Sequence, residues 1–185
     1  MPQWQAPKTT AELTGMTVKA LTTSIMHDDI SNLLRRHNLE EIDPQAWYPA
    51  QDLANLFQEI SNAPNASPTF VSLGMAAAQI GIDALPPAMK DLPLEVFLSK
   101  YDDMWQARHR NGDIGHIRFE KVNDNHMIMR YNAIYPDDIF YGVFYAYARH
   151  FRPKNMGFSV SYDETALRQD QGGEESVIHI RLTPQ

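Results

Sequence analysis

The sequence predicts an α+β fold in which an N-terminal helical half packs on a four-stranded antiparallel sheet, formed by a C-terminal ββαββ unit. Between positions 114 and 184, four segments alternate apolar and polar side chains, the period of two of half-buried strands. Between the second and third segments, aromatic side chains recur at helical spacing: Phe140, Phe144, Tyr147 and Phe151. The first half shows helical periodicity instead. Helices followed by strands are typical of one α+β domain.

The chain is expected to begin with a loose arm over residues 1–15, which holds two prolines and several polar residues. A single domain then covers residues 16–185. Apolar residues from Val18 to Leu34 recur at helical spacing and predict one helix, or two short ones, that end near His37.

Asp43-Pro44 matches the pattern of an N-cap followed by proline at the first helical position. It predicts a helix through positions 47–60, in which Pro49 lies in the first turns or divides the helix. Ser67-Pro68 similarly predicts the start of a helix over positions 69–82.

The helix at 69–82 is rich in small residues: Gly74, Ala76, Ala77, Ala78 and Gly81. Small side chains let another backbone or a flat ligand come close, and tight helix packing is the favoured explanation here. A last helix is expected from Leu94 to about Arg110, with an apolar stripe of Phe97, Leu98, Tyr101, Met104 and Trp105.

The C-terminal unit has turn residues between its elements. Asn123-Asp124-Asn125 separates the first two strands, and Pro136 ends the second strand and opens the aromatic helix. A third strand is expected around 156–162, then a turn at 171–173 and a last strand over 177–182.

Composition excludes several classes of protein. The 185 residues are 43% hydrophobic and 21% charged, as in a globular protein with a core. The net charge of −7 argues against nucleic acid as the main partner. The local basic clusters at 35–37 and 108–110 are both interpreted as solvated helix ends. With no cysteine, disulfides, thiolate catalysis and iron–sulfur clusters are excluded. No signal peptide or membrane-spanning stretch is evident, which predicts a cytoplasmic protein.

No catalytic motif and no metal site is predicted. His27-Asp28-Asp29 resembles a metal cluster only superficially, because adjacent residues of a helix do not share a face. The acid pairs Asp102-Asp103 and Asp137-Asp138 diverge for the same reason, and are better explained as solvated faces or helix caps.

From about Met16 to Leu182 the chain resembles a superfamily that joins H-NOX (haem nitric-oxide/oxygen-binding) domains, 4-vinyl-reductase domains and the TRAPP vesicle-tethering subunits. The resemblance rests on short motifs in a matching order: residues 17–21, Trp47-Tyr48-Pro49, Phe97-Leu98 with Asp102, 131–136 and 177–182. It implies the α+β fold described above and a ligand-binding, sensory or dimeric function.

The departures from this superfamily concern haem. Where the resemblance implies a haem-ligating histidine, the chain has Met104-Trp105. The Tyr-x-Ser-x-Arg motif that holds haem propionates becomes residues 131–135, in which only Tyr131 is kept. No cofactor is therefore expected. A shifted haem ligand, His109, is the alternative, since it lies one helical turn beyond Trp105.

Three functions stay open. The first is a non-enzymatic sensory or regulatory domain that binds a small apolar ligand or a signalling protein without haem, and it predicts a pocket near Trp105 and the helix of Gly74 to Gly81. The second is a dimeric structural adaptor of the TRAPP type, which predicts no cavity and a large apolar interface. The third is an enzyme or accessory protein acting on a tetrapyrrole, for which no proton donor or redox cofactor site is evident.

The first function is preferred, so the protein is not expected to be an enzyme. A homodimer is expected, because closed two-fold assemblies are the commonest. The candidate ligand-binding residues are Phe97, Tyr101, Trp105, Gly74, Tyr131 and Phe144.

Overall fold

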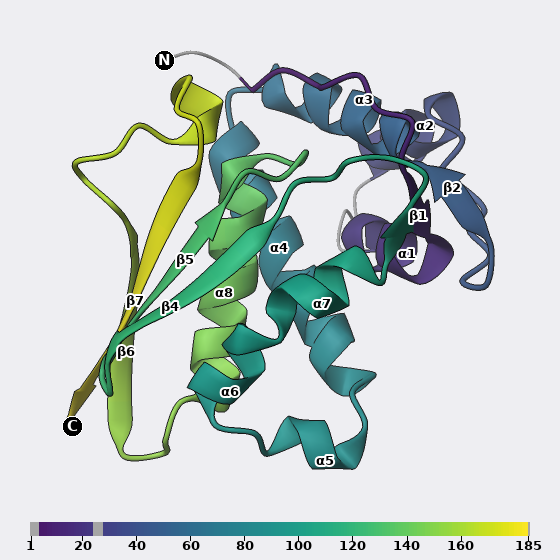
Figure 1. Cartoon of the computed structure of the whole chain (residues 1–185). Coiled ribbons are helices and arrows are strands. Elements are labelled where there is room, and N and C mark those ends of the chain that lie inside the picture. The colour runs from purple at the N-terminus through teal and green to yellow at the C-terminus, as the bar shows by residue number, and fades with distance from the viewer. Residues whose placement is uncertain (1–3, 24–27, 185) are drawn as a thin grey trace.

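The computed structural model describes residues 4–23 and 28–184, with side chains from position 32 onward in the second range. It confirms the α+β class. A four-stranded sheet lies on one side of the molecule, helix α8 packs against it, and α4 lies behind α8 (Figure 1). Helices α1 to α3 and a second, three-stranded sheet form the far side.

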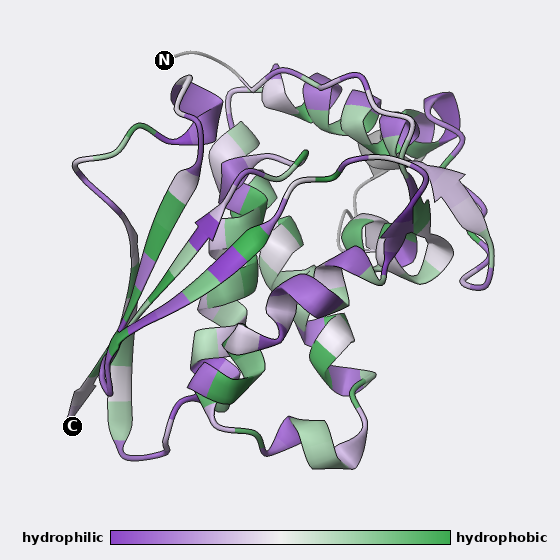
Figure 2. Cartoon of the chain, viewed as in Figure 1, coloured by the Kyte–Doolittle hydropathy of each residue, from purple (hydrophilic) through white to green (hydrophobic). Residues whose placement is uncertain are grey.

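The large sheet contains the four predicted strands: β4 (Ile117–Asn123), β5 (His126–Tyr131), β6 (Met156–Tyr162) and β7 (Ser176–Pro184). Their spatial order is β4-β5-β7-β6, and every neighbouring pair is antiparallel. Hydrophobic and hydrophilic residues alternate along these strands (Figure 2). One row across the inner face shows the register, with Met129 opposite Phe119 on one side and Ile178 on the other.

Helix α8 (Asp137–Phe151) covers the inner face of this sheet. Pro136 ends the preceding extended segment at φ −54° and ψ 140°. Two acids in the first turn and Arg149 with His150 in the last turn complement the helix dipole. Aromatic rings join the helix to the sheet, in the pairs Tyr131–Phe140, Tyr145–Phe158 and Tyr141–Tyr162.

Helix α4 (Ala66–Asp83) crosses α8 on the side away from the sheet, at a pair of glycines. A Cβ at Gly74 would lie 2.0 Å from the carbonyl oxygen of Ile139, and a Cβ at Gly142 would lie 2.1 Å from that of Val71. The two helices therefore pack backbone against backbone. The favoured explanation of Gly74 as a position of tight helix packing is confirmed.

A small sheet that the sequence does not predict joins three distant segments. Strands β1 (Glu12–Thr14), β2 (Trp47–Pro49) and β3 (His109–Arg110) pair in the order β2-β1-β3. Strands of two or three residues are too short to show a period. The N-terminal segment is therefore not a loose arm throughout, because residues 12–14 form a strand in which Leu13 is buried.

The remaining helices are short or lie in the N-terminal half: α1 (Gly15–Thr23), α2 (Asp28–Arg36), α3 (Ala50–Ser61), α5 (Pro87–Lys90), α6 (Leu94–Ser99), α7 (Tyr101–Gln106) and the 3₁₀ helix η1 (Gln169–Gln171). The segment up to His37 thus forms two helices, the second of the expected alternatives.

Two predicted helix starts are wrong. Helix α3 begins at Ala50, because Pro49 restricts Tyr48 to an extended conformation and its own nitrogen cannot donate. Asp43 caps a turn instead, since its Oδ1 accepts a hydrogen bond of 2.9 Å from the Gln45 N–H. Helix α4 begins at Ala66, which places Ser67-Pro68 inside its first turn.

The expected single helix from Leu94 to Arg110 is also wrong, because it is broken at Lys100 and ends at Gln106. Lys100 has φ −98° and ψ 1°, and its N–H bonds to the Phe97 carbonyl in a tighter turn. The break does not move the aromatic stripe out of the core, since Phe97, Tyr101 and Trp105 are all buried.

We predict that Gly142→Ala destabilises the fold by about 1–3 kcal/mol or more, because the new Cβ overlaps the α4 backbone and a packed core resists extra volume. Urea unfolding measures this change.

Gly81→Ala is the matched control, since its Cβ would meet nothing closer than the Tyr147 hydroxyl at 3.7 Å. There the helix propensity of alanine should raise stability by up to about 1 kcal/mol. Equal stability of the two variants would contradict a backbone contact at Gly142.

Candidate functional site

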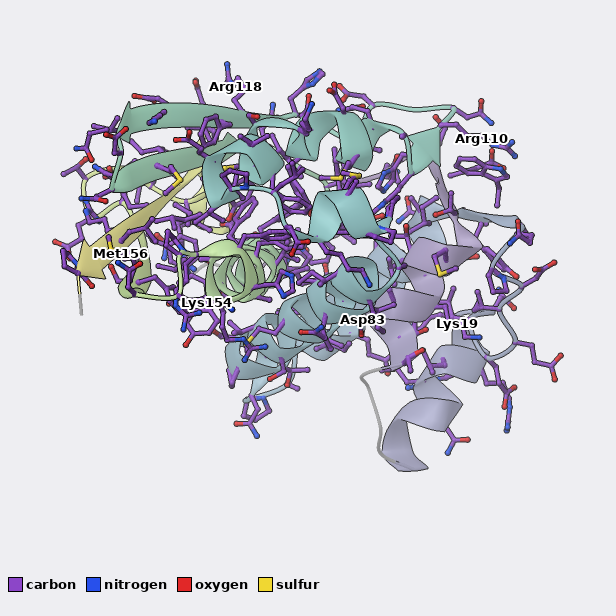
Figure 3. All side chains as sticks on the ribbon, turned by 90° about the horizontal axis from the view of Figure 1, so that it is seen from below. Lys19, Asp83, Arg110, Arg118, Lys154 and Met156 are labelled. Atoms are coloured by element: carbon purple, nitrogen blue, oxygen red, sulfur yellow. The ribbon has the colours of Figure 1, made fainter. Side chains whose placement is uncertain are left out.

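A pocket of about 360 Å³ lies between the helical half and the α7–α8 side of the core. Helices α1, α4, α7 and α8, strand β1 and several connecting segments contribute its wall, which is apolar over most of its area: Thr14, Met16, Thr17, Ala20, Leu21, Pro44, Gln45, Ala77, Ile80, Gly81, Ala84, Tyr101, Trp105, Arg108, Tyr135, Ile139, Phe140, Val143 and Tyr147. Figure 3 shows two of the helices that contribute to it, α1 with Lys19 and α4 with Asp83 at its end.

The small residues of α4 shape one side of the pocket. Ala77, Gly81 and Ala84 recur along the helix at intervals of three and four residues, so they share a face. Gly74 belongs to the same helix but meets α8 instead, where no side chain fits. The C-terminal half of α4 thus stands back from α8 and leaves the space that its N-terminal half closes.

The structure divides the candidate ligand-binding residues into two groups. Tyr101 and Trp105 line the pocket. The other four lie in the core outside it, and Gly74 is at the helix crossing. The three aromatic ones pack on other rings, with distances between ring centres of 4.1 Å for Phe97–Phe151, 5.5 Å for Phe144–Tyr101 and 4.6 Å for Tyr131–Phe140.

Arg108 is the only charged residue of the pocket wall. The small sheet positions it, because the Thr14 N–H donates a 3.0 Å hydrogen bond to the Arg108 carbonyl. The sequence predicts a solvated helix end for residues 108–110. In the structure His109 is buried, and Arg110 forms an ion pair with Glu12 at 2.6 Å. That interpretation is therefore wrong for His109.

Two phenol groups lie near Arg108. Burial raises the pKa of Tyr101 well above its usual range, and the charge of Arg108 opposes this effect. Burial likewise raises the pKa of Tyr147, and Arg108 lowers it to a smaller extent. Both hydroxyls are thus protonated at neutral pH, and Tyr147 is hydrogen-bonded to both Tyr101 and Arg108.

Behind the pocket wall, Trp105, His109 and Tyr135 form a closed polar network. His109 Nδ1 lies 2.8 Å from the Trp105 carbonyl oxygen, which only accepts, so Nδ1 carries the proton. Nε2 is then the acceptor of the Tyr135 hydroxyl at 3.1 Å. Burial lowers the pKa of His109 to about 4, so the ring is neutral at pH 7. Neither ring nitrogen is free for another ligand.

The indole of Trp105 packs edge-on against Tyr135 and Phe140, each with ring centres 5.3 Å apart. Among residues 4–23 and 32–184, its Nε1 is the one buried side-chain polar atom without a hydrogen-bond partner. An unsatisfied buried donor costs about 1–3 kcal/mol and often marks a functional site.

A second polar cluster ties the loop before β7 to the start of α8, and it does not reach the pocket. Asp137 accepts a 2.6 Å hydrogen bond from the Ser176 hydroxyl, and the Asp170 N–H donates to its other oxygen at 2.9 Å. Burial, and then the charge of Asp137, raise the pKa of Asp170 to about 7. Asp137 is therefore a buried structural group and not a solvated cap.

Within the described part of the chain, no three histidines or acids are placed to hold a metal ion, and no helix is long and apolar enough to cross a bilayer. His27 and the side chains of Asp28 and Asp29 lie outside the described residues.

Sequence reasoning missed Arg108, Tyr135 and Tyr147 as residues of this region. The spacing of Ala77, Gly81 and Ala84 was an available signal for the pocket. Nothing in the sequence indicates that Arg108 faces a cavity, because a helix end and a short strand, which are not recognisable from periodicity, place it there.

No family model matches the chain, and no curated protein matches it. Solved structures do. An H-NOX protein from S. oneidensis in the Fe(II)NO ligation state aligns with a TM-score of 0.70 at 14% identity, covering 92% of this chain and 99% of that one. An oxygen-binding H-NOX domain related to soluble guanylate cyclases aligns at 0.62 and 16% identity, covering 92% of each chain. The fold is therefore H-NOX-like, as the sequence predicts.

We predict that Trp105→Ala costs about 3–5 kcal/mol of stability, because a large ring packed on two others is lost. Chemical unfolding measures it. Trp47→Ala is the control: this half-buried ring lies under Arg110 at 4.3 Å, and its loss should cost about 1 kcal/mol. Similar costs for both variants would place Trp105 at the surface.

We also predict that stability contributed by His109 is lost on acidification. The folded pKa is below the unfolded one, so the unfolded state binds more protons between pH 6.5 and about 4. The contribution is fully present above pH 6.5 and falls by up to about 3 kcal/mol as the pH drops through this window.

The measurement is the free energy of unfolding against pH for the wild type and His109→Gln. Asp170 has the opposite slope, because its raised pKa makes stability fall as the pH rises from about 4 to 7. Asp170 is present in both proteins, so its contribution cancels when the unfolding free energy of the variant is subtracted from that of the wild type. A difference that does not change with pH would contradict a buried neutral His109.

Proposed function

We propose that this protein is a non-enzymatic sensory or regulatory domain that binds a small apolar ligand in the pocket, without haem. The observation that supports it is the pocket itself. Its volume of about 360 Å³ falls in the range of small-molecule sites, and it combines an apolar wall with a few polar groups. Its position near Trp105 and the small-residue helix is the one that this function predicts.

Haem does not fit the residues present. The lining residues include no histidine or cysteine. The nearest histidine, His109, has both ring nitrogens engaged, and its Nε2 accepts from the hydroxyl of Tyr135. Tyr135 is also the residue found where the resemblance implies the arginine that would hold a propionate. The axial ligand and the anion clamp are thus replaced by one internal hydrogen bond.

The placement of the pocket suits a sensor. Its wall contains residues from α1 and α4 on one side and from α7 and α8 on the other, so a ligand contacts both halves of the fold. A ligand that binds one arrangement of these helices more tightly shifts the population toward it. The ligand-binding H-NOX structures that share this fold are consistent with such a function.

The other two functions have less support. Among the described residues, the large hydrophobic side chains that are exposed are Met16, Val122 and Leu167, which lie on α1, on β4 and in the loop before η1. Scattered positions of this kind do not form the apolar interface that an adaptor needs. A homodimer and a cytoplasmic location stay predictions. No described cluster supplies the proton donor and redox cofactor that a tetrapyrrole enzyme requires.

The proposal is tested with the purified protein and Nile red, a neutral apolar dye. We expect saturable binding at one site per chain, and a preparation without a Soret band that does not take up haem stoichiometrically. Gly81→Leu should abolish dye binding, because its side chain projects into the pocket. Gln79→Leu, exposed on the same helix, should leave it unchanged.

Two results would contradict the proposal. Equal dye binding by wild type and Gly81→Leu would show that the pocket is not the binding site. Stoichiometric haem uptake that is lost in His109→Ala would show that the haem ligand has moved by one turn.

A further inference from the structure

We propose that the ligand of this pocket is an apolar monocarboxylate whose acid group pairs with Arg108. The inference rests on the proposed function, because it assigns a chemical class to the ligand of the same site. It is carried by the charge of the pocket wall, by the hydroxyl groups around that charge and by the apolar remainder.

The charge of the wall is a single positive one. Arg108 lines the pocket and is half-buried, and none of the other lining residues is acidic or basic. Within the described residues Arg108 has no carboxylate partner, whereas Arg110, two positions on, pairs with Glu12 at 2.6 Å. A half-buried guanidinium without a counter-ion is costly, and an anionic ligand group would remove that cost.

Two phenol groups add donors at the same end of the pocket. Tyr101 and Tyr147 both line it, and the charge of Arg108 lowers the pKa of each of them against the larger effect of burial. The rings of Tyr101 and Tyr147 have centres 5.4 Å apart, and both residues line the pocket together with Arg108. Protonated phenols and a guanidinium are all donors, and together they match the lone pairs of a carboxylate.

The number of charges selects a carboxylate over a phosphate. A guanidinium presents two parallel N–H groups that fit the two oxygens of one carboxylate. A phosphate monoester carries nearly two negative charges at neutral pH and three acceptor oxygens. One arginine balances a monoanion only, and the lining holds no second cation.

The rest of the wall accommodates an apolar body. Ala77, Ile80 and Val143 offer aliphatic surface, and Phe140 and Trp105 offer rings. The ligand is therefore amphipathic, with most of its surface apolar and one acidic end.

The test uses three probes with the same ten-carbon chain, decanoate, decanol and decylammonium, each titrated against bound Nile red. We expect decanoate to displace the dye at a concentration at least about tenfold lower than decanol, as for a hydrogen bond to a charged group. Decylammonium should be the weakest. Arg108→Gln should abolish the advantage of decanoate and leave decanol unchanged. Arg108→Lys should restore part of it.

Arg110→Gln is the matched control, since this neighbouring arginine pairs with Glu12 and does not line the pocket. It should keep the full preference for decanoate. If decanol and decanoate displace the dye equally, or if Arg108→Gln keeps the preference, the assignment of a carboxylate is overturned while the apolar pocket stands. If the wild type binds neither Nile red nor any of the probes, the proposed function fails as well.

Discussion

The contact of α4 with α8 at Gly74 and Gly142 is the constraint on which the rest of the structure depends. A methyl group at either position would overlap the facing backbone, so the helices are held at the shortest distance that their main chains allow. α8 thereby lies between the sheet and α4, and both faces of it are buried. The same contact leaves space farther along α4, where Ala77 and Gly81 have no backbone opposite them.

The pocket depends on side chains that fill the region beside it. Trp105, His109 and Tyr135 form a network in which each polar atom but one has a partner, and the neutral state of His109 is part of that network. Under the proposed function, the fold would set where a ligand binds, and these three residues would limit which kind fits.

The ββαββ unit could be predicted because its strands are six to nine residues long and alternate apolar with polar or small residues, as in Met156–Tyr162. The small sheet could not, because strands such as His109–Arg110 have no period of their own and exist only through distant partners. Gly74 was correctly assigned to close packing, yet no local signal identified Gly142 as its partner. The position of Arg108 in a pocket wall could not be predicted for the same reason. Its backbone is held by β1, a strand far away in the sequence.

The small sheet also has a consequence for the order in which the chain assembles. Arg110 and Glu12 are 98 positions apart, and closing so long a loop costs more entropy than two or three backbone hydrogen bonds return. We therefore expect β1 to pair late in folding and to fray early. Thr14 belongs to β1 and also to the pocket wall. If the pocket holds a ligand as proposed, the residence time of that ligand would depend on fraying of this three-residue strand.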